Sequence, residues 1–232
     1  MKRIYTILCI PLICCAHICA QVVPVEDYLQ QAGVYAEIYN GKIEESYNTV
    51  LYKNLPYYIN SDFTEASIVY KNNYYPHQKA RLDLYREQLA VVPPGTQLAV
   101  VLGSSNIEKV YMHGKTFVWL TPSKAGGLKP GYYMLLSEGA KTQLFCKEKY
   151  TIRKNLSQER VFFYFDHEIR YYLLYNNRHY AVKNKGSFSK LFPQYKKQIN
   201  QFVKDNKLNF KHNPIESLTA LAVYCEELTG WE

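Results

Sequence analysis

The chain has 232 residues and a formal charge of +8, with 28 Lys and Arg against 20 Asp and Glu. This length predicts one domain or two small ones, and it excludes a mini-protein that would need disulfides or a metal to stay folded. Tyrosine is abundant, with 23 Tyr against 10 Phe. Because tyrosine favours a pleated, half-buried surface, we expect a β-rich fold.

Residues 1–20 have the pattern of a cleavable secretory signal peptide. Lys2 and Arg3 precede an apolar run that ends at Cys15, which is too short to span a bilayer, and Ala20 offers a cleavage point. We therefore expect an exported protein that is periplasmic or associated with the outer membrane or the cell surface. No transmembrane segment is expected in the mature chain.

Removing this segment changes the cysteine count and the charge. Four of the six cysteines lie in it, so only Cys146 and Cys225 remain, and the loss of Lys2 and Arg3 lowers the formal charge from +8 to +6. An oxidising compartment would permit a Cys146–Cys225 disulfide. Two cysteines are not a disulfide scaffold, however, and the alternative favoured by the composition is a pair of separately buried thiols.

From about Tyr47 to Val182 the sequence shows short runs of period two separated by turn residues, the pattern of an antiparallel β domain. The runs lie at residues 67–70, 74–75, 81–85, 97–102, 107–112, 116–120, 132–137, 142–146, 161–165, 171–175 and 179–182. Three pairs of neighbouring runs predict hairpins, with turns at His113-Gly114-Lys115, Glu138-Gly139 and Asn176-Asn177-Arg178. Residues 121–131 predict a loop, and residues 155–160 a polar break. We expect about ten strands within residues 21–183, in a β-sandwich or a highly curved sheet.

After Gly186 the hydrophobic period changes to three and four, which predicts an amphipathic helix. Its apolar residues are Phe188, Leu191, Phe192, Tyr195, Ile199, Phe202 and Val203. A second helix is predicted to begin with Asn213 as N-cap and Pro214 at the first helical position. Residues 184–232 thus predict a C-terminal helical hairpin packed on the β domain, because neither helix could bury its apolar stripe alone.

The strongest charge feature lies between Lys183 and Lys211, where eight lysines stand against one acid, Asp205. On a continuous helix, lysines seven residues apart would form a stripe opposite the apolar face. Such a stripe is typical of a solvated helix face. The functional alternative is contact with phospholipid headgroups, acidic glycan or an acidic patch of a partner protein. The candidate contact residues are Lys190, Lys197, Lys204, Lys207 and Lys211.

The sequence contains no recognisable catalytic, cofactor-binding or metal-binding motif. The run Asp166-His167-Glu168 places three ligand types in a row, but a surface turn explains it better, and the second histidine of a zincin is missing. There is no G-x-S-x-G elbow, P-loop or G-x-G-x-x-G. A triad built from distant residues, such as Ser104 or Ser105 with His113, stays open.

Tyrosine pairs offer a further alternative, an aromatic platform for sugars. The pairs are Tyr57-Tyr58, Tyr74-Tyr75, Tyr132-Tyr133 and Tyr171-Tyr172. Because neighbouring side chains of a strand point to opposite faces, at most one of each pair could line a shared surface. Core and cross-strand packing explain most of these tyrosines.

Residues 55–70 and 80–91 resemble exported proteins of Bacteroidota whose function is unknown, and residues 191–210 look like the C-terminal helix that those proteins carry. The resemblance covers most of the mature chain and depends on composition rather than on catalytic motifs. It implies a location in a Gram-negative cell envelope, and it transfers no activity and no functional residue.

The expected function is therefore non-enzymatic. We expect an exported envelope protein that binds a partner protein or an anionic envelope component, without a cofactor, and nucleic acid is not expected as a partner. The alternative is an envelope hydrolase that acts on glycan or peptide with an active site built from scattered residues. A pocket lined by a converging acid pair or a Ser/His pair would favour the hydrolase, whereas a filled β core with a basic flank would favour binding.

Overall fold

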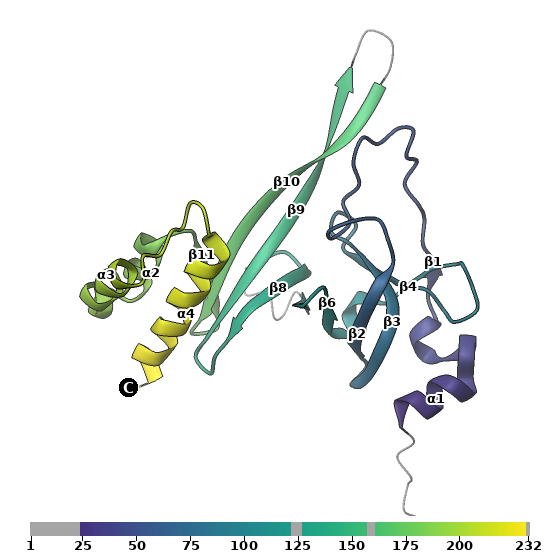
Figure 1. Cartoon of the computed structure of the whole chain (residues 1–232), viewed down its shortest axis with the longest axis horizontal. Coiled ribbons are helices and arrows are strands. Elements are labelled where there is room, and N and C mark those ends of the chain that lie inside the picture. Colours follow the sequence, from purple (N-terminus) through teal and green to yellow (C-terminus); the bar gives the residue numbers. More distant parts are fainter. Residues whose placement is uncertain (1–23, 122–126, 157–160, 231–232) are drawn as a thin grey trace, which may run out of the picture.

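The computed structural model of the chain describes residues 24–121, 127–156 and 161–230, so the expected signal peptide lies outside the described residues. The described chain forms one open antiparallel sheet of 11 strands, in the order β1-β5-β4-β3-β2-β6-β7-β8-β9-β10-β11 (Figure 1). The expectation of a mainly β fold is confirmed. Of the two expected arrangements, the structure has the single curved sheet and not the sandwich.

The strands differ greatly in length. In chain order they are β1 (Lys42–Ile43), β2 (Thr64–Tyr70), β3 (Asn73–Asp83), β4 (Gln88–Val91), β5 (Val100–Val101), β6 (Ile107–Met112), β7 (Lys115–Leu120), β8 (Gly131–Glu138), β9 (Thr142–Leu156), β10 (Val161–Tyr175) and β11 (Arg178–Val182). The helices are α1 (Val25–Ala32), α2 (Lys185–Leu191), α3 (Lys196–Asp205) and α4 (Pro214–Gly230), with short 3₁₀ helices η1 (Gly33–Tyr35), η2 (Glu37–Tyr39), η3 (Ser104–Asn106) and η4 (Pro193–Tyr195).

Three predicted hairpins are present, and two of them close through left-handed turn residues. The β6–β7 turn has φ of 50° at His113 and 68° at Gly114, and the β10–β11 turn has φ of 50° at Asn176 and 58° at Asn177. Two consecutive positive φ angles match the turn whose twist suits a two-residue hairpin. The β8–β9 hairpin forms around Gly139 as expected.

Several strand bounds differ from the prediction. The run at 74–75 and residues 81–83 of the next run belong to the single strand β3, whereas the run at 97–102 contributes only the two residues of β5. The predicted strands 161–165 and 171–175 are one continuous strand, β10, so the surface turn expected at residues 166–168 is wrong. Each of residues 166–170 is exposed, which removes the alternation that the prediction relied on.

The long β9–β10 hairpin extends beyond the rest of the sheet. Its two strands pair over residues 142–156 and 161–175, but β8 pairs with β9 only at residues 143–146, and β11 pairs with β10 only at residues 171–175. The outer part of the hairpin is therefore a two-stranded arm, visible as the diagonal ribbon in Figure 1. Phe165, on one face of the arm, is buried in a cluster with Tyr47 and Tyr57, whereas Arg153 and Asp166 form an exposed cross-strand ion pair at 2.8 Å on the other face.

The C-terminal helices cover the part of the sheet that ends at β11. The single helix expected from residue 188 is divided into α2 and α3, because Pro193 lacks a backbone N–H and disfavours helical angles at Phe192, whose φ and ψ are −123° and 65°. The helix predicted from Pro214 is present as α4. No described helix is long and apolar enough to cross a bilayer.

Two buried clusters divide one face of the sheet between them. Leu144 and Cys146 lie two residues apart on β9; Leu144 packs with α2, α3 and α4, and Cys146 packs with the curved part of the sheet that precedes it in the chain. Phe145, between them, joins a third cluster with Tyr133, as expected for side chains that alternate across a strand. The unpredicted helix α1 packs against the curved part.

A buried ion pair links the turn before β4 to the centre of the sheet. The Lys147 ammonium contacts the Glu87 carboxylate, and their side chains are 11% and 24% exposed. Glu87 also accepts the backbone N–H of Tyr132 at 2.7 Å, and Lys147 donates to the Tyr132 carbonyl at 2.8 Å. Burial raises the pKa of Glu87 and lowers the pKa of Lys147, because both charged forms lose water.

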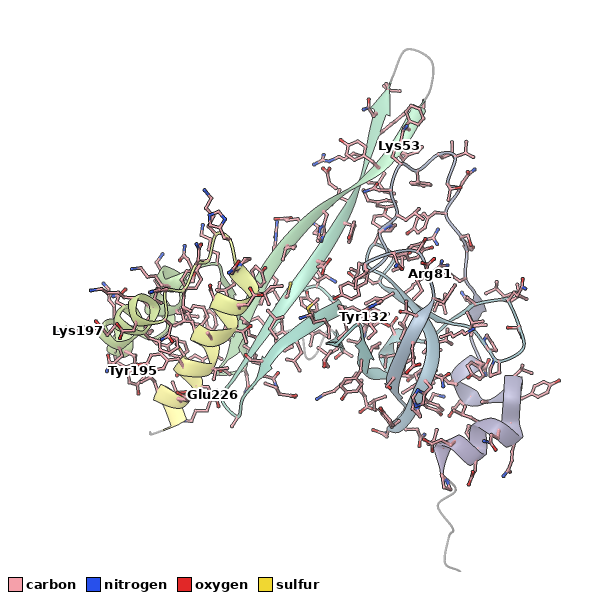
Figure 2. All side chains as sticks on the ribbon, in the orientation of Figure 1. Lys53, Arg81, Tyr132, Tyr195, Lys197 and Glu226 are labelled. Carbon is pink, nitrogen blue, oxygen red and sulfur yellow. The ribbon has the colours of Figure 1, made fainter. Side chains whose placement is uncertain are left out.

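A single carboxylate, that of Glu226, clamps helix α4 to the β8–β9 turn. Glu226 of α4 accepts the backbone N–H of Lys141 at 2.9 Å, and the backbone N–H and hydroxyl of Thr142 at 2.6 and 2.7 Å (Figure 2). A Cβ at Gly139 would lie 2.5 Å from Glu226 Cδ, so a larger residue there would displace the Glu226 carboxylate. Partial burial acts to raise the pKa of Glu226, but these hydrogen bonds outweigh it and the pKa is lowered.

Replacing Lys147 by Met should destabilise the fold by about 3–5 kcal/mol, because it leaves the Glu87 carboxylate buried without its partner. The double variant Glu87→Leu with Lys147→Met should lose less than the single one, since neither charge is then buried. Urea unfolding of the wild type, both single variants and the double variant gives the coupling between the two residues. Additive losses would contradict the buried pair.

Replacing Glu226 by Gln should destabilise the protein at neutral pH by about 1–2 kcal/mol, below the full range for charged hydrogen bonds because the group is partly exposed. A lowered folded pKa means that this stability is present above the unfolded pKa of about 4.3 and is lost as pH falls through the folded value. The deficit of the variant should therefore shrink in acid, as measured by urea unfolding across pH.

Glu227→Gln is the matched control for this series. Glu227 is the next residue on α4 and is exposed, and the structure shows no hydrogen bond or ion pair for its carboxylate. Its replacement should leave stability unchanged at every pH. An equal loss in both variants would rule out the Glu226 clamp.

Candidate functional site

Eight lysine side chains form an exposed surface on and around α2 and α3, here named the lysine surface. Its residues are Lys183, Lys185, Lys190, Lys196, Lys197, Lys204, Lys207 and Lys211, and all of them are exposed. Figure 2 shows Lys197 on the outer side of the helices, away from the sheet. The lysine surface is thus formed by one stretch of sequence.

All eight lysines of the lysine surface lack a carboxylate partner among the described residues. None of its eight side chains takes part in an ion pair or hydrogen bond with a described residue. In the β region, by contrast, Lys71 pairs with Glu37, and Lys109 pairs with Glu138 at 3.0 Å. The one acid within the lysine stretch, Asp205, instead accepts a hydrogen bond from Gln201 at 2.7 Å.

The expected stripe along one helix does not exist as such. Lys190 lies on α2, Lys197 and Lys204 lie on α3, and Lys207 and Lys211 follow the end of α3. The break at Pro193 and the helix end at Asp205 divide the predicted stripe into three segments. The charges therefore lie on three segments rather than along one helix face.

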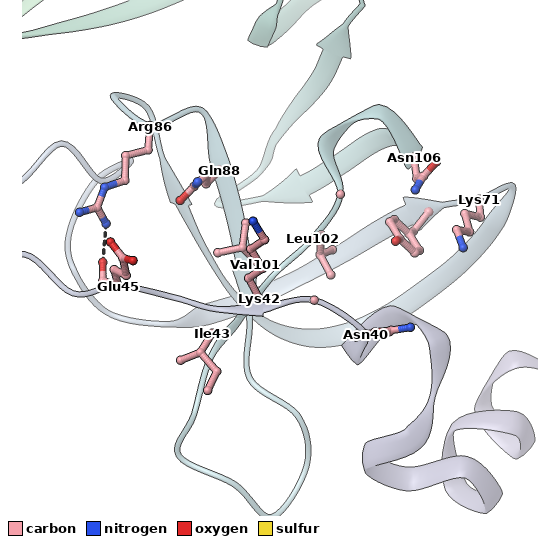
Figure 3. Close-up of a pocket in the computed structure, with 13 residues that line it drawn as sticks. Asn40, Lys42, Ile43, Glu45, Lys71, Arg86, Gln88, Val101, Leu102 and Asn106 are labelled. Atoms are coloured by element: carbon pink, nitrogen blue, oxygen red, sulfur yellow. Dashed lines mark hydrogen bonds between the residues drawn. The ribbon is translucent and has the colours of Figure 1, made fainter.

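A second feature, a polar cleft of about 650 Å³, lies at the opposite end of the sheet (Figure 3). It is bordered by β1, by β5 and its following residues, by the β2–β3 turn and by η3, and it is open to solvent. Its lining residues include Asn40, Lys42, Glu45, Tyr70, Lys71, Arg86, Gln88, Leu102 and Asn106. Five separate stretches of chain supply them, so no sequence motif could have revealed the site.

The described lining of the cleft consists mainly of amides, cations and apolar side chains. Among its described lining residues, Glu45 is the one acid, and there is no His, Ser or Cys. An acid pair or a nucleophile with a base, which hydrolysis would need, is therefore not assembled among them. The amides and cations that are present can orient a polar or anionic ligand.

The structure separates the other residues that the sequence singled out. Ser104 lies in η3 before β6, and His113 follows β6 at its far end, where its ring nitrogen contacts Thr64 Oγ1 at 3.1 Å. In β10, His167 pairs with Glu148 at 3.0 Å. Among the described residues, no three His, Cys, Asp or Glu side chains are grouped as metal ligands.

The tyrosine pairs mostly serve the core. Tyr57, Tyr75, Tyr132 and Tyr133 are between 1% and 4% exposed, whereas Tyr74 is 52% exposed. The buried rings meet other aromatic rings edge to face, as Trp119 and Tyr132 do at 5.0 Å between centroids. A shared sugar platform on the surface is therefore not formed by these pairs.

Comparison with known proteins gives no family for the chain. No family model matches it, and no curated protein or solved structure is significantly similar to it. Its function is therefore inferred from the surface and the cleft alone.

The two cysteines among the described residues should be unreactive in the folded protein. Cys146 and Cys225 are free thiols that belong to different buried clusters, and burial raises the pKa of each to about 12. Alkylation read peptide by peptide should therefore label neither residue in native buffer and both in denaturant. A peptide that contains both cysteines joined by a disulfide would contradict this prediction.

Proposed function

We propose that this protein is an exported, non-enzymatic component of the cell envelope that binds an anionic surface through its lysine surface. The observation that carries the proposal is the exposure of all eight lysines together with their lack of carboxylate partners among the described residues. Unpaired cations gain the most when an anionic partner approaches, because no internal ion pair has to be broken first.

The shape of the lysine surface favours phospholipid headgroups as the partner. The lysines come from α2, α3 and the segment that follows α3, so they spread over an area instead of lining a groove. An anionic leaflet attracts each nearby lysine by about 1 kcal/mol, and several lysines are enough for reversible attachment. The signal-peptide pattern at residues 1–20 supports a location where such a leaflet is met from outside the cytoplasm.

The double variant Lys197→Glu with Lys204→Glu tests the proposal. It should weaken binding to vesicles of phosphatidylglycerol and phosphatidylethanolamine by about 30-fold or more at low salt, since two attractive charges of about 1 kcal/mol each are lost. Co-sedimentation with the vesicles measures the effect, and phosphatidylcholine vesicles should bind neither protein.

Lys79→Glu with Lys115→Glu is the control of equal charge change. Both lysines are exposed on the β region, and the structure shows no partner for either side chain among the described residues. This variant should bind the anionic vesicles nearly as well as the wild type. The proposal fails if both double variants lose binding equally, or if wild-type binding shows no dependence on salt.

A further inference from the structure

We infer that the polar cleft at the β1 end of the sheet is a binding site for a small acidic sugar, meaning a saccharide that carries a carboxylate or a phosphate. The inference concerns residues far from the lysine surface along the sheet order, and it does not depend on the function proposed above. A volume of about 650 Å³ lies within the usual range for ligand pockets.

The backbone just before β1 lies very close to β5 at one wall of the cleft. A Cβ at Gly41 would lie 2.2 Å from the carbonyl oxygen of Val101, so only glycine permits this approach. Tyr70 and Leu102, which are 3% and 1% exposed, line the inside of the cleft. These two buried side chains form the bottom of the cleft and are held by packing. The entropy lost when a ligand binds is therefore lower.

Several polar side chains in the cleft have no partner within the described chain. They belong to Asn40, Lys42, Gln88 and Asn106, for which the structure shows no side-chain hydrogen bond or ion pair. Each amide offers two N–H donors and one carbonyl acceptor. Sugar hydroxyls both donate and accept, so a set of free amides along one cleft matches a polyhydroxylated ligand better than a simple ion.

Cations at both ends of the cleft favour a ligand that carries an acid group. The Arg86 guanidinium lies 4.0 Å from the centre of the Tyr47 ring and donates to the Glu45 carbonyl, so it is held in place. Lys71 is held by its ion pair with Glu37. Figure 3 shows Arg86 at one end, Lys71 and Asn106 at the other, and Lys42 between them. Lys42 is therefore the cation that is free to meet a carboxylate or a phosphate.

Titration calorimetry of the full chain with four probes tests the inference. Glucuronate or trehalose phosphate should bind, and the stronger of the two identifies carboxylate or phosphate as the acid group. Glucose and inorganic phosphate should each bind at least about tenfold more weakly than the better acidic sugar, because glucose lacks the acid group and inorganic phosphate lacks the sugar hydroxyls. The inference is overturned if neither acidic sugar binds, or if glucose or inorganic phosphate binds equally well.

Two variants locate the site. Lys42→Glu and Asn106→Ala should each weaken binding of the better acidic sugar by about tenfold or more. Both residues are exposed, so folding should be retained, as checked by circular dichroism. Two substitutions are used so that a local disturbance of the short strand β1 in one variant does not decide the result. Unchanged binding in both variants would overturn the site.

Controls separate this site from the lysine surface. Lys79→Glu makes the same charge change on β3 outside the cleft and should leave sugar binding unchanged. The Lys197→Glu with Lys204→Glu variant should also keep sugar binding, even where it loses vesicle binding. Loss of sugar binding in either control would show that the effect is one of net charge, and it would overturn the cleft as the site.

Discussion

The pairing of β9 with β10 is the constraint on which the other parts of the fold depend. Fifteen residues of each strand are paired. β8 and β11 extend the sheet from the base of this hairpin, and Leu144 and Leu173 receive the C-terminal helices. Lys147, on the same strand as Leu144, meets Glu87 from the turn before β4. One hairpin thus connects two hydrophobic cores.

The outer half of that hairpin is supported by residues far away in the chain. The backbone of Phe163 pairs with Leu51 and Lys53, at 2.9 Å in both hydrogen bonds, and the Asn54 side chain bonds the backbone of Phe165 in both directions. Tyr52 stacks on Phe165 with the ring centres 5.4 Å apart. Because an isolated two-stranded ribbon is only marginally stable in water, these contacts explain how the arm stays ordered as far as they reach.

The electrostatic organisation of the molecule is uneven. Many charges of the β region are paired, as in Arg81 with Glu44 at 2.6 Å, and the guanidinium of Arg81 also lies between the rings of Tyr57 and Phe63. The lysine surface has no such partners among the described residues, and the cleft combines held cations with free amides. These two cationic features lie at opposite ends of the sheet order, so one molecule could hold an anionic surface at one end and a small acidic ligand at the other.

What the sequence determined by itself is local. The alternation of residues 107–120, the turns at His113-Gly114 and Asn176-Asn177, and the start of α4 at Pro214 could all be predicted, because neighbouring residues decide them. Pro193 by itself predicts a break in the helix, but the apolar spacing of three and four continues across it and predicts one continuous helix. The concentration of lysines between residues 183 and 211 could also be seen in the sequence.

What only the tertiary structure decided depends on partners distant in the chain. β10 runs through its charged centre because β9 pairs with it along its whole length, which no local pattern reports. The cleft needs five segments to meet, and the clamp of Glu226 needs the β8–β9 turn, more than 80 residues earlier, to present its N–H groups. The sequence showed that lysines were numerous between residues 183 and 211, but only the folded chain showed that they have no carboxylate partner among the described residues, since pairing is a property of positions in space.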